Sequence, residues 1–284
     1  MSRPRPSRTA GFVPIELLAI VAVLFLLVGI ALPLTSRFKS KSASTICVSN
    51  HKQVVVAWQI YANEHEGKTA NNFIIPSTMD ALIRGTFDNW ANNIMTWSAN
   101  GIEGVSVTNQ ALAGGTLNPY TSGDAKIYRC PSDNFLSPAQ RARGWKYRSR
   151  TMAMNALIGR TEHSSNGPTA GGRSWMDSSY RQWLKVGDIP QPATTWVTID
   201  EHPDSVNDGF FVISIGSGIW ADLPGALHGS STTFSFADAH VETRKWRTKR
   251  LNVPVRYNFP TVTIDAEGRK DFAWYKENLG LVRY

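Results

Sequence analysis

The longest apolar stretch of the chain runs from Phe12 to Leu34 and contains one charged residue, Glu16. A helix needs about 20 predominantly apolar residues to cross a membrane, so this pattern predicts a transmembrane helix. A carboxylate inside such a segment is costly and therefore indicates a function. The tail before it, residues 1–11, carries three arginines and no acid. By the positive-inside rule we expect this tail in the cytoplasm and the C-terminal body outside it.

A second helical pattern follows directly. After Pro33, apolar residues recur at spacings that place them on one helix face: Cys47, Val54, Trp58 and Tyr61. Gly67 is a typical residue at a helix end. The sequence therefore predicts one helix over residues 12–66, bent at Pro33, with an amphipathic second half over residues 35–66.

Beyond residue 67 the period changes to that of strands. Short β-branched and aromatic runs alternate with turn residues, at residues 147–155, 194–199, 210–215, 232–237 and 239–242, and residues 79–83 predict a short helix. We find no helical pattern of the length that parallel crossovers need. The predicted fold class is α+β: a long N-terminal helix packed on an antiparallel sheet, with loop-rich inserts, in a β-rich domain over residues 67–284.

The N-terminal pattern is that of a known family. Gly11-Phe12, followed by Glu16 and a long apolar helix, resembles the start of type IV pilins and type II secretion pseudopilins. The resemblance implies that a prepilin peptidase cuts after Gly11 and methylates Phe12, that Glu16 assists assembly, and that Pro33 bends the helix. The chain departs from the pattern at Pro14, where the family usually has Leu. In the first helical turn a proline is tolerated, although it bears on how well the peptidase fits.

Three further motifs resemble a large bacterial subfamily of pilin-like proteins. They are Cys47-x-x-Asn50-x-Lys52-Gln53, Cys130-Pro131-x-Asp133, and His228 followed after nine residues by Asp238. The subfamily has Gly where this chain has Ala239, and an alanine there is strained if the backbone φ angle is positive. Asn50 and Gln53 are candidates to brace neighbouring loops, or simply form an exposed polar face.

The chain has two cysteines, Cys47 and Cys130. Disulfides persist outside the cytoplasm, and one bond between them would tie the long helix to the globular body. Two buried free thiols are the alternative.

Two groups of residues are candidates to bind a metal ion. The loop from Asp200 to Gly209 holds carboxylates of the kind that Ca²⁺ prefers, namely Asp200, Glu201, Asp204 and Asp208. Its spacing is not that of an EF-hand, and a polar turn that caps backbone N–H groups is the alternative. The second group is His228, Asp238 and His240, with Asp200 nearby. There we favour a hydrogen-bonded structural pair.

Composition adds little to this picture. The net charge of +8 comes partly from the N-terminal arginines and partly from a cluster at residues 244–250, which we interpret as a solvated strand end rather than a specific nucleic-acid site. Ten tryptophans could stack on sugars, but tryptophan is also common in cores. We find no nucleophile elbow, phosphate loop, zinc-protease motif or Cys-x-x-Cys pair, and we expect no enzyme.

These patterns together predict a structural pilin-like or pseudopilin subunit of a type IV pilus or type II secretion system. It would have a leader at residues 1–11, a transmembrane and polymerisation helix at 12–34, and a single-pass inner-membrane location with an extracytoplasmic body. Its expected partners are prepilin peptidase, other pilin or pseudopilin subunits and the inner membrane. The alternative is an anchored binding protein or glycan-directed enzyme that uses the leader for export.

Overall fold

The computed structural model describes residues 14–99, 114–212, 214–216 and 218–284, without the side chains of residues 14–16 and 27–40. Its internal contacts divide the chain into two units. We call Met1–Ser42 the N-terminal unit and Ala43–Tyr284 the body. The body contains the sheet and the core.

The longest element is the helix α1, Pro14–Glu64. It starts at Pro14, a position where a missing N–H costs nothing, and it continues through Pro33 without interruption. The bend predicted at Pro33 stays a prediction, because the side chains around it are not described. The helix ends two residues before the predicted end, where the N–H of Gly67 donates to the carbonyl of Ala62 at 2.8 Å and Gly67 adopts a φ of 78°. One long helix is therefore present.

The predicted transmembrane segment requires a correction. In the part of the chain that the structure describes, no helix is both long and apolar enough to cross a membrane. A span takes about 20 consecutive apolar residues, whereas the apolar run with described side chains in α1 covers residues 17–26. The prediction of a transmembrane first half, and with it that of a single-pass inner-membrane protein, is not supported.

The body is built on a five-stranded sheet in the order β3-β1-β2-β5-β6. The strands are β1 (Met152–Asn155), β2 (Trp196–Asp200), β3 (Phe210–Phe211), β5 (Ser231–Phe236) and β6 (Val241–Lys245). A separate two-stranded sheet pairs β4 (Ile219–Trp220) with β7 (Val262–Thr263). The strands of the five-stranded sheet overlap the predicted runs, although β1 and β3 are shorter than expected, whereas β4 and β7 were not predicted.

The sheet is mixed, which corrects the prediction of an antiparallel sheet. β1 pairs with β2 antiparallel and with β3 parallel. The loop over residues 201–209 reverses the chain after β2 and passes the end of β1, so β3 runs against β2 and hence along β1. A two-residue strand needs no crossover helix for this, and the sequence pattern therefore gave no sign of it.

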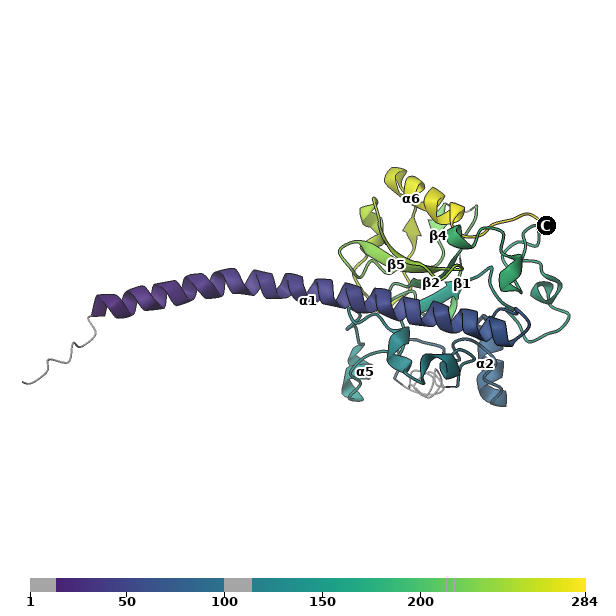
Figure 1. The fold of residues 1–284 in the computed structure, drawn as a ribbon, viewed down its shortest axis with the longest axis horizontal. Helices are drawn as coiled ribbons and strands as arrows, with labels where there is room; N and C mark the ends of the chain where they lie inside the picture. The colour runs from purple at the N-terminus through teal and green to yellow at the C-terminus, as the bar shows by residue number, and fades with distance from the viewer. Residues whose placement is uncertain (1–13, 100–113, 213, 217) are drawn as a thin grey trace, which may run out of the picture. The chain divides into compact units, whose positions relative to one another are not determined.

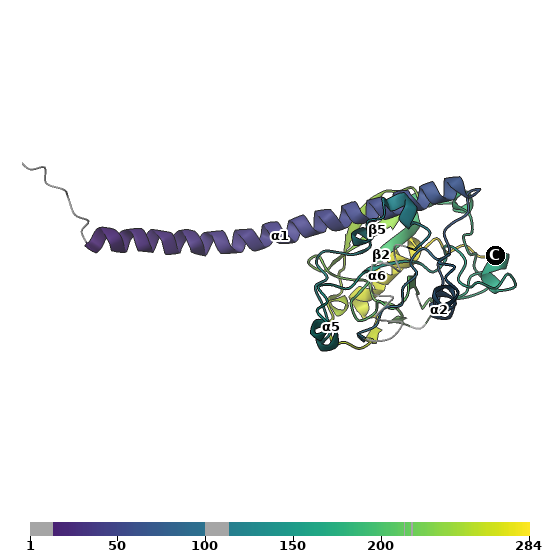
Figure 2. The same ribbon diagram turned by 90° about the horizontal axis from the view of Figure 1, so that it is seen from below.

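Two helices lie on opposite faces of the sheet. Figure 1 and Figure 2 both place the body's part of α1 alongside β2 and β5, with α6 (Ala266–Glu277) on the other side. The predicted stripe of α1 is buried, with Cys47, Val54 and Trp58 fully inaccessible, while Tyr61 is half-buried. On the α6 side, aromatic rings pack edge to face, such as Phe234 with Trp274.

Several short helices complete the body. The α-helices are α2 (Ile75–Arg84), which contains the short helix predicted at 79–83, and α5 (Pro138–Ala142). The 3-10 helices are η1 (Asn118–Thr121), η2 (Ala125–Tyr128), η3 (Pro168–Gly171), η4 (Val186–Asp188), η5 (Pro192–Thr194) and η6 (Lys249–Leu251). The helix α6 was not predicted. Its N-terminus is capped by Asp265, whose carboxylate accepts from the N–H of Gly268.

Candidate functional site

The N-terminal unit presents an apolar surface on α1. Every residue from 17 to 26 is apolar and exposed, and Phe25 has 75% of its surface accessible. The predicted processing residues Gly11 and Phe12 lie outside the described part of the chain. Glu16 lies in α1, but its side chain is not described. The structure thus describes this surface and leaves the predicted roles of Gly11, Phe12 and Glu16 untested.

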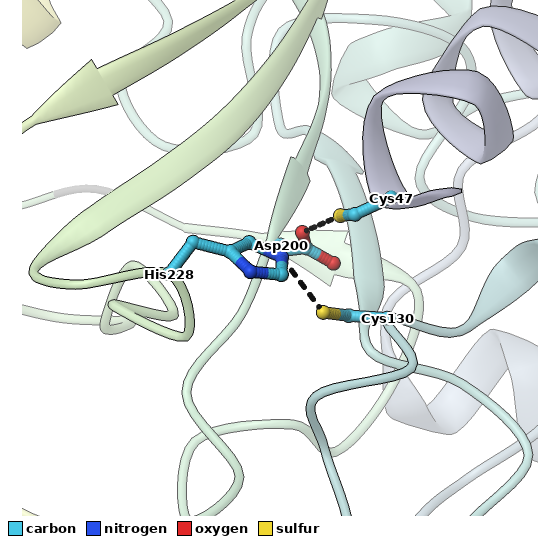
Figure 3. A group of neighbouring side chains, drawn as sticks. All are labelled: Cys47, Cys130, Asp200 and His228. Carbon is cyan, nitrogen blue, oxygen red and sulfur yellow. Dashed lines mark hydrogen bonds between the residues drawn. The ribbon is translucent and has the colours of Figure 1, made fainter. Parts of the chain in front are cut away.

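The body contains a cluster of four side chains, Cys47, Cys130, Asp200 and His228, where α1 meets the sheet (Figure 3). They come from four separate segments. Cys47 lies on α1, Cys130 follows η2, Asp200 ends β2, and His228 lies in the turn before β5. One potential ligand atom from each lies within 4.8 Å of the other three. The two cysteines and Asp200 are fully buried, and His228 is half-buried.

Each thiol of the cluster contacts a different partner. The Sγ of Cys47 donates to Oδ2 of Asp200 at 2.7 Å, and the Sγ of Cys130 lies 3.1 Å from Nε2 of His228. Figure 3 shows the carboxylate of Asp200 next to the sulfur of Cys47 and the imidazole of His228 next to the sulfur of Cys130. The cluster therefore consists of two thiol–partner pairs held next to each other.

A second layer of polar groups holds the cluster in place. The hydroxyl of Thr151 donates to Oδ1 of Asp200 at 2.8 Å. His51, one turn after Cys47 on α1, places Nε2 at 3.3 Å from Oδ2 of Asp200, without the alignment of a hydrogen bond. Its Nδ1 lies 2.8 Å from the hydroxyl of Thr198. Because these groups are all buried, the carboxylate is fixed in orientation.

The pKa values of the two thiols are shifted in opposite directions. Hydrogen bonding between them, together with burial and the charge of Asp200, raises the pKa of Cys47. The same hydrogen bond from Cys47 lowers the pKa of Cys130 to about 7, despite burial. Cys130 is therefore the thiol that loses its proton first.

The carboxylate and the imidazole are both held towards their charged forms. Burial by itself raises the pKa of Asp200, but the charge of His51 and the hydrogen bonds from Cys47 and Thr151 outweigh burial and lower it. Burial by itself lowers the pKa of His228, but its contact with Cys130 outweighs burial and raises it.

Cys47 and Cys130 are both free and buried, which is the second of the two alternatives that the sequence left open. The structure does place them next to each other, as a bond between the long helix and the body requires. The sequence identified the two cysteines as a pair, but it did not show that both Asp200 and His228 lie beside them. The prediction that Asp200 lies near His228 agrees with this cluster, but the expected companions Asp238 and His240 do not belong to it.

The other carboxylates of the predicted Ca²⁺ loop have separate partners. Glu201 accepts from the hydroxyl of Ser205, Asp204 accepts from the N–H groups of Arg256 and Tyr257, and Asp208 accepts from the N–H of Phe210. Within the described ranges, Asp200 is the member of this loop that joins a potential metal-binding group. The loop acids act mainly as caps.

Asp238 and His240 form a pair of their own in the turn between β5 and β6. Oδ1 of Asp238 lies 2.6 Å from Nδ1 of His240, and neither belongs to the cluster around His228. Between them Ala239 adopts a φ of 69°, the conformation in which glycine is favoured over alanine.

The polar residues of the α1 motif brace loops rather than forming a purely exposed face. The amide of Asn50 donates to the carbonyl of Arg129 at 3.0 Å, and Nζ of Lys52 donates to the carbonyl of Ala239 at 2.6 Å. The amide of Gln53 reaches only Ser49 on its own helix. The spacing of the motif was thus a usable signal for contacts to the Cys130 loop and the β5–β6 turn.

Two other sequence features are mainly structural. Six of the ten tryptophans are buried in the body, and Trp175 is the exposed one. In the basic cluster at residues 244–250, Arg250 pairs with Asp265 at 3.3 Å, and the guanidinium of Arg244 lies over the ring of Trp274. Neither feature forms an evident binding surface for sugar or nucleic acid.

Comparisons with protein-family models, with curated proteins and with solved structures gave no match. The family assignment consequently rests on the sequence motifs alone and remains a prediction.

Proposed function

We propose that this chain is a structural, pilin-like subunit that is processed after Gly11 and polymerises through its N-terminal helix. The observation that carries the proposal is the exposure of every residue from 17 to 26 on α1, all of them apolar. The resemblance of Gly11, Phe12 and Glu16 to a prepilin cleavage and assembly motif supplies the processing step.

The distribution of apolar residues on α1 favours assembly with several like helices. Because apolar side chains lie on all sides of this segment, one flat partner would leave most of them in water. A helix that is apolar all round is buried in a larger assembly, and exposed apolar patches of this kind mark interaction sites. Burying each large side chain contributes about 1.5–3 kcal/mol. A bundle of homologous or related subunits covers every side at once.

Glu16 would give this assembly its register. A carboxylate inside an apolar bundle is costly unless it is paired. After cleavage behind Gly11, the new α-amine of Phe12 is a positive charge near the same end of the helix. Pairing Glu16 of one subunit with the α-amine of a neighbour removes the penalty only when the helices are correctly staggered.

The processing step is tested by the intact mass of the mature protein isolated from its host. We expect the loss of residues 1–11 and the gain of one methyl group. A chain that keeps its first eleven residues would disprove processing and would identify Pro14 as the position to vary first.

The assembly step is tested by a pair of matched substitutions. Phe25→Lys places a charge on the α1 surface, whereas Ile83→Lys does the same at a residue of α2 that is 69% exposed. We expect Phe25→Lys and Glu16→Ala to abolish sedimentable filaments without changing the fold, and Ile83→Lys to leave them intact. Normal filaments from both α1 variants would refute the proposal. A processed protein that never enters filaments would instead favour a binding protein that uses the leader for export.

A further inference from the structure

We propose that Cys47, Cys130, Asp200 and His228 bind one Zn²⁺ ion that fastens α1 to the sheet. This site is independent of the filament proposal, since all four residues belong to the body.

The donor set is the first reason. Two sulfurs, one imidazole nitrogen and one carboxylate oxygen are the ligand types that Zn²⁺ uses in four-coordinate protein sites. Thiolates select zinc over the hard cations Ca²⁺ and Mg²⁺, which prefer oxygen. The predicted Ca²⁺ loop and the proposed site thus share only Asp200.

The geometry is the second reason. In a tetrahedral site with zinc–ligand distances near 2.0–2.3 Å, neighbouring ligand atoms lie about 3.3–3.8 Å apart. The four atoms here already lie within 4.8 Å of one another. The contacts Cys47–Asp200 at 2.7 Å and Cys130–His228 at 3.1 Å are those of hydrogen bonds, so they lengthen by less than about 1 Å as the ion replaces the protons. Each thiol releases its proton to solvent, and no electron is transferred.

The surroundings are the third reason. Zinc ligands in proteins are oriented by groups behind them. Here the hydroxyl of Thr151 donates to Oδ1 of Asp200, and Nδ1 of His228 lies 3.4 Å from the hydroxyl of Ser132. His51 contacts the same carboxylate from the helix side. The ligands are therefore prearranged, and the ion would join segments that are distant in the sequence.

A disulfide between the two cysteines is the competing use of the same sulfurs. It would bring them to about 2.05 Å and would remove the thiol that donates to Asp200, leaving a buried carboxylate without that partner. It would also leave the imidazole of His228 without its contact to the Cys130 thiol. Zinc uses all four side chains, whereas the disulfide uses two.

The test uses the full-length chain, reduced and stripped of metal, titrated with Co²⁺ and then with Zn²⁺. We expect one Co²⁺ per chain, with the near-ultraviolet absorption of thiolate-to-cobalt charge transfer, its displacement by Zn²⁺, and a raised Tm with Zn²⁺. His228→Ala should weaken binding by about 100-fold or more, beyond the 10–100-fold typical of outer-shell changes. His240→Ala is the matched control and should leave affinity within about threefold.

Three results would overturn the proposal. They are a reduced wild-type chain that takes up no Co²⁺ or Zn²⁺, a His228→Ala variant that binds as tightly as the wild type, and native protein isolated without reductant that carries a complete Cys47–Cys130 disulfide and no zinc. Because His228 is only half-buried, this variant is expected to fold, which circular dichroism checks. If it does not, Cys130→Ser with the same titration decides the question.

Discussion

The side-chain amide of Asn50 donates a hydrogen bond to the carbonyl of Arg129, the residue directly before Cys130. Asn50 lies on α1, one turn after Cys47 on the same helix. This contact fixes the position of the loop that carries one thiol relative to the helix that carries the other. The pairing of Asn50 with the Cys130 loop therefore links two motifs that are separate in the sequence.

Replacing Asn50 by Ala should destabilise the body. The change leaves the part-buried Arg129 carbonyl without its donor, and an unsatisfied group costs up to about 1–3 kcal/mol, the upper end applying to full burial. For a domain of this size each kcal/mol lowers Tm by about 2–4 °C. Gln53→Ala is the control, because that amide is exposed and reaches only Ser49. Equal melting temperatures for the two variants would contradict a bracing role for Asn50.

A buried ion pair behind the Cys130 loop should matter more. Oδ2 of Asp133 lies 3.1 Å from Nη2 of Arg148, with both side chains 1% exposed. Removing one partner of a buried pair costs about 3–5 kcal/mol, since the other charge stays buried and uncompensated. We expect Asp133→Asn to lower the free energy of unfolding by about 3 kcal/mol or more in denaturant titrations.

The matched control for that pair is Glu267→Gln. Glu267 pairs with Lys270 at 3.3 Å on the surface of α6, where both side chains are more than half exposed. Exposed pairs contribute about 0–1 kcal/mol. If Glu267→Gln lowered the free energy of unfolding as much as Asp133→Asn does, burial would not explain the contribution of the Asp133–Arg148 pair.

Ala239 should be improved by glycine. Its φ of 69° costs a residue with a Cβ about 1–2 kcal/mol, and the greater freedom of glycine in the unfolded chain offsets about 0.4–1 kcal/mol of the gain. We expect Ala239→Gly to raise stability by up to about 1 kcal/mol, measured by thermal and denaturant unfolding. Ala153→Gly, in the centre of β1, should act with the opposite sign, because a strand alanine has no such strain. A destabilising Ala239→Gly would show that the turn tolerates alanine.

The sequence predicted those features of the structure that depend on residues close together in the chain, and it missed those that depend on distant residues. The buried stripe of α1 was predicted because its period is local, and so was the possible strain at Ala239. The helix α6 was missed because its buried residues include Gly268 and Asp271, which give no apolar period. Nothing local indicated that β3 pairs parallel to β1.

The candidate site was predicted only in pieces. Cys47 and Cys130 were recognised as a pair, and Asp200 was expected near His228, but nothing in the sequence joined these two pairs into one cluster. Their convergence depends on the end of β2, the turn before β5 and the loop after η2 meeting at α1. That meeting is set by the order of strands in the sheet, which single-sequence patterns do not carry.

Asp208 should make the body less stable as pH rises from about 4 to about 6. Burial raises its pKa to about 6 from 3.8. A raised folded-state pKa contributes stability that is fully present below the unfolded pKa and is lost as pH rises through the folded one. Asp208→Asn keeps an oxygen acceptor for the N–H of Phe210 and removes the charge. We therefore expect the variant to match the wild type below pH about 4 and to exceed it above pH about 6.

The stability difference between Asp208→Asn and the wild type follows from the rise in the pKa of Asp208. That rise is about 2 pKa units and corresponds to about 3 kcal/mol at most. Asp177→Asn is the control with the opposite sign. The pKa of Asp177 is lowered by hydrogen bonds from Ser179, so its contribution is present above the unfolded pKa and is lost as pH falls. Urea unfolding of the three proteins at several pH values separates the cases. A gain at Asp208→Asn that is the same at pH 3 and pH 7 would mean that packing, rather than the cost of a buried charge, sets the effect.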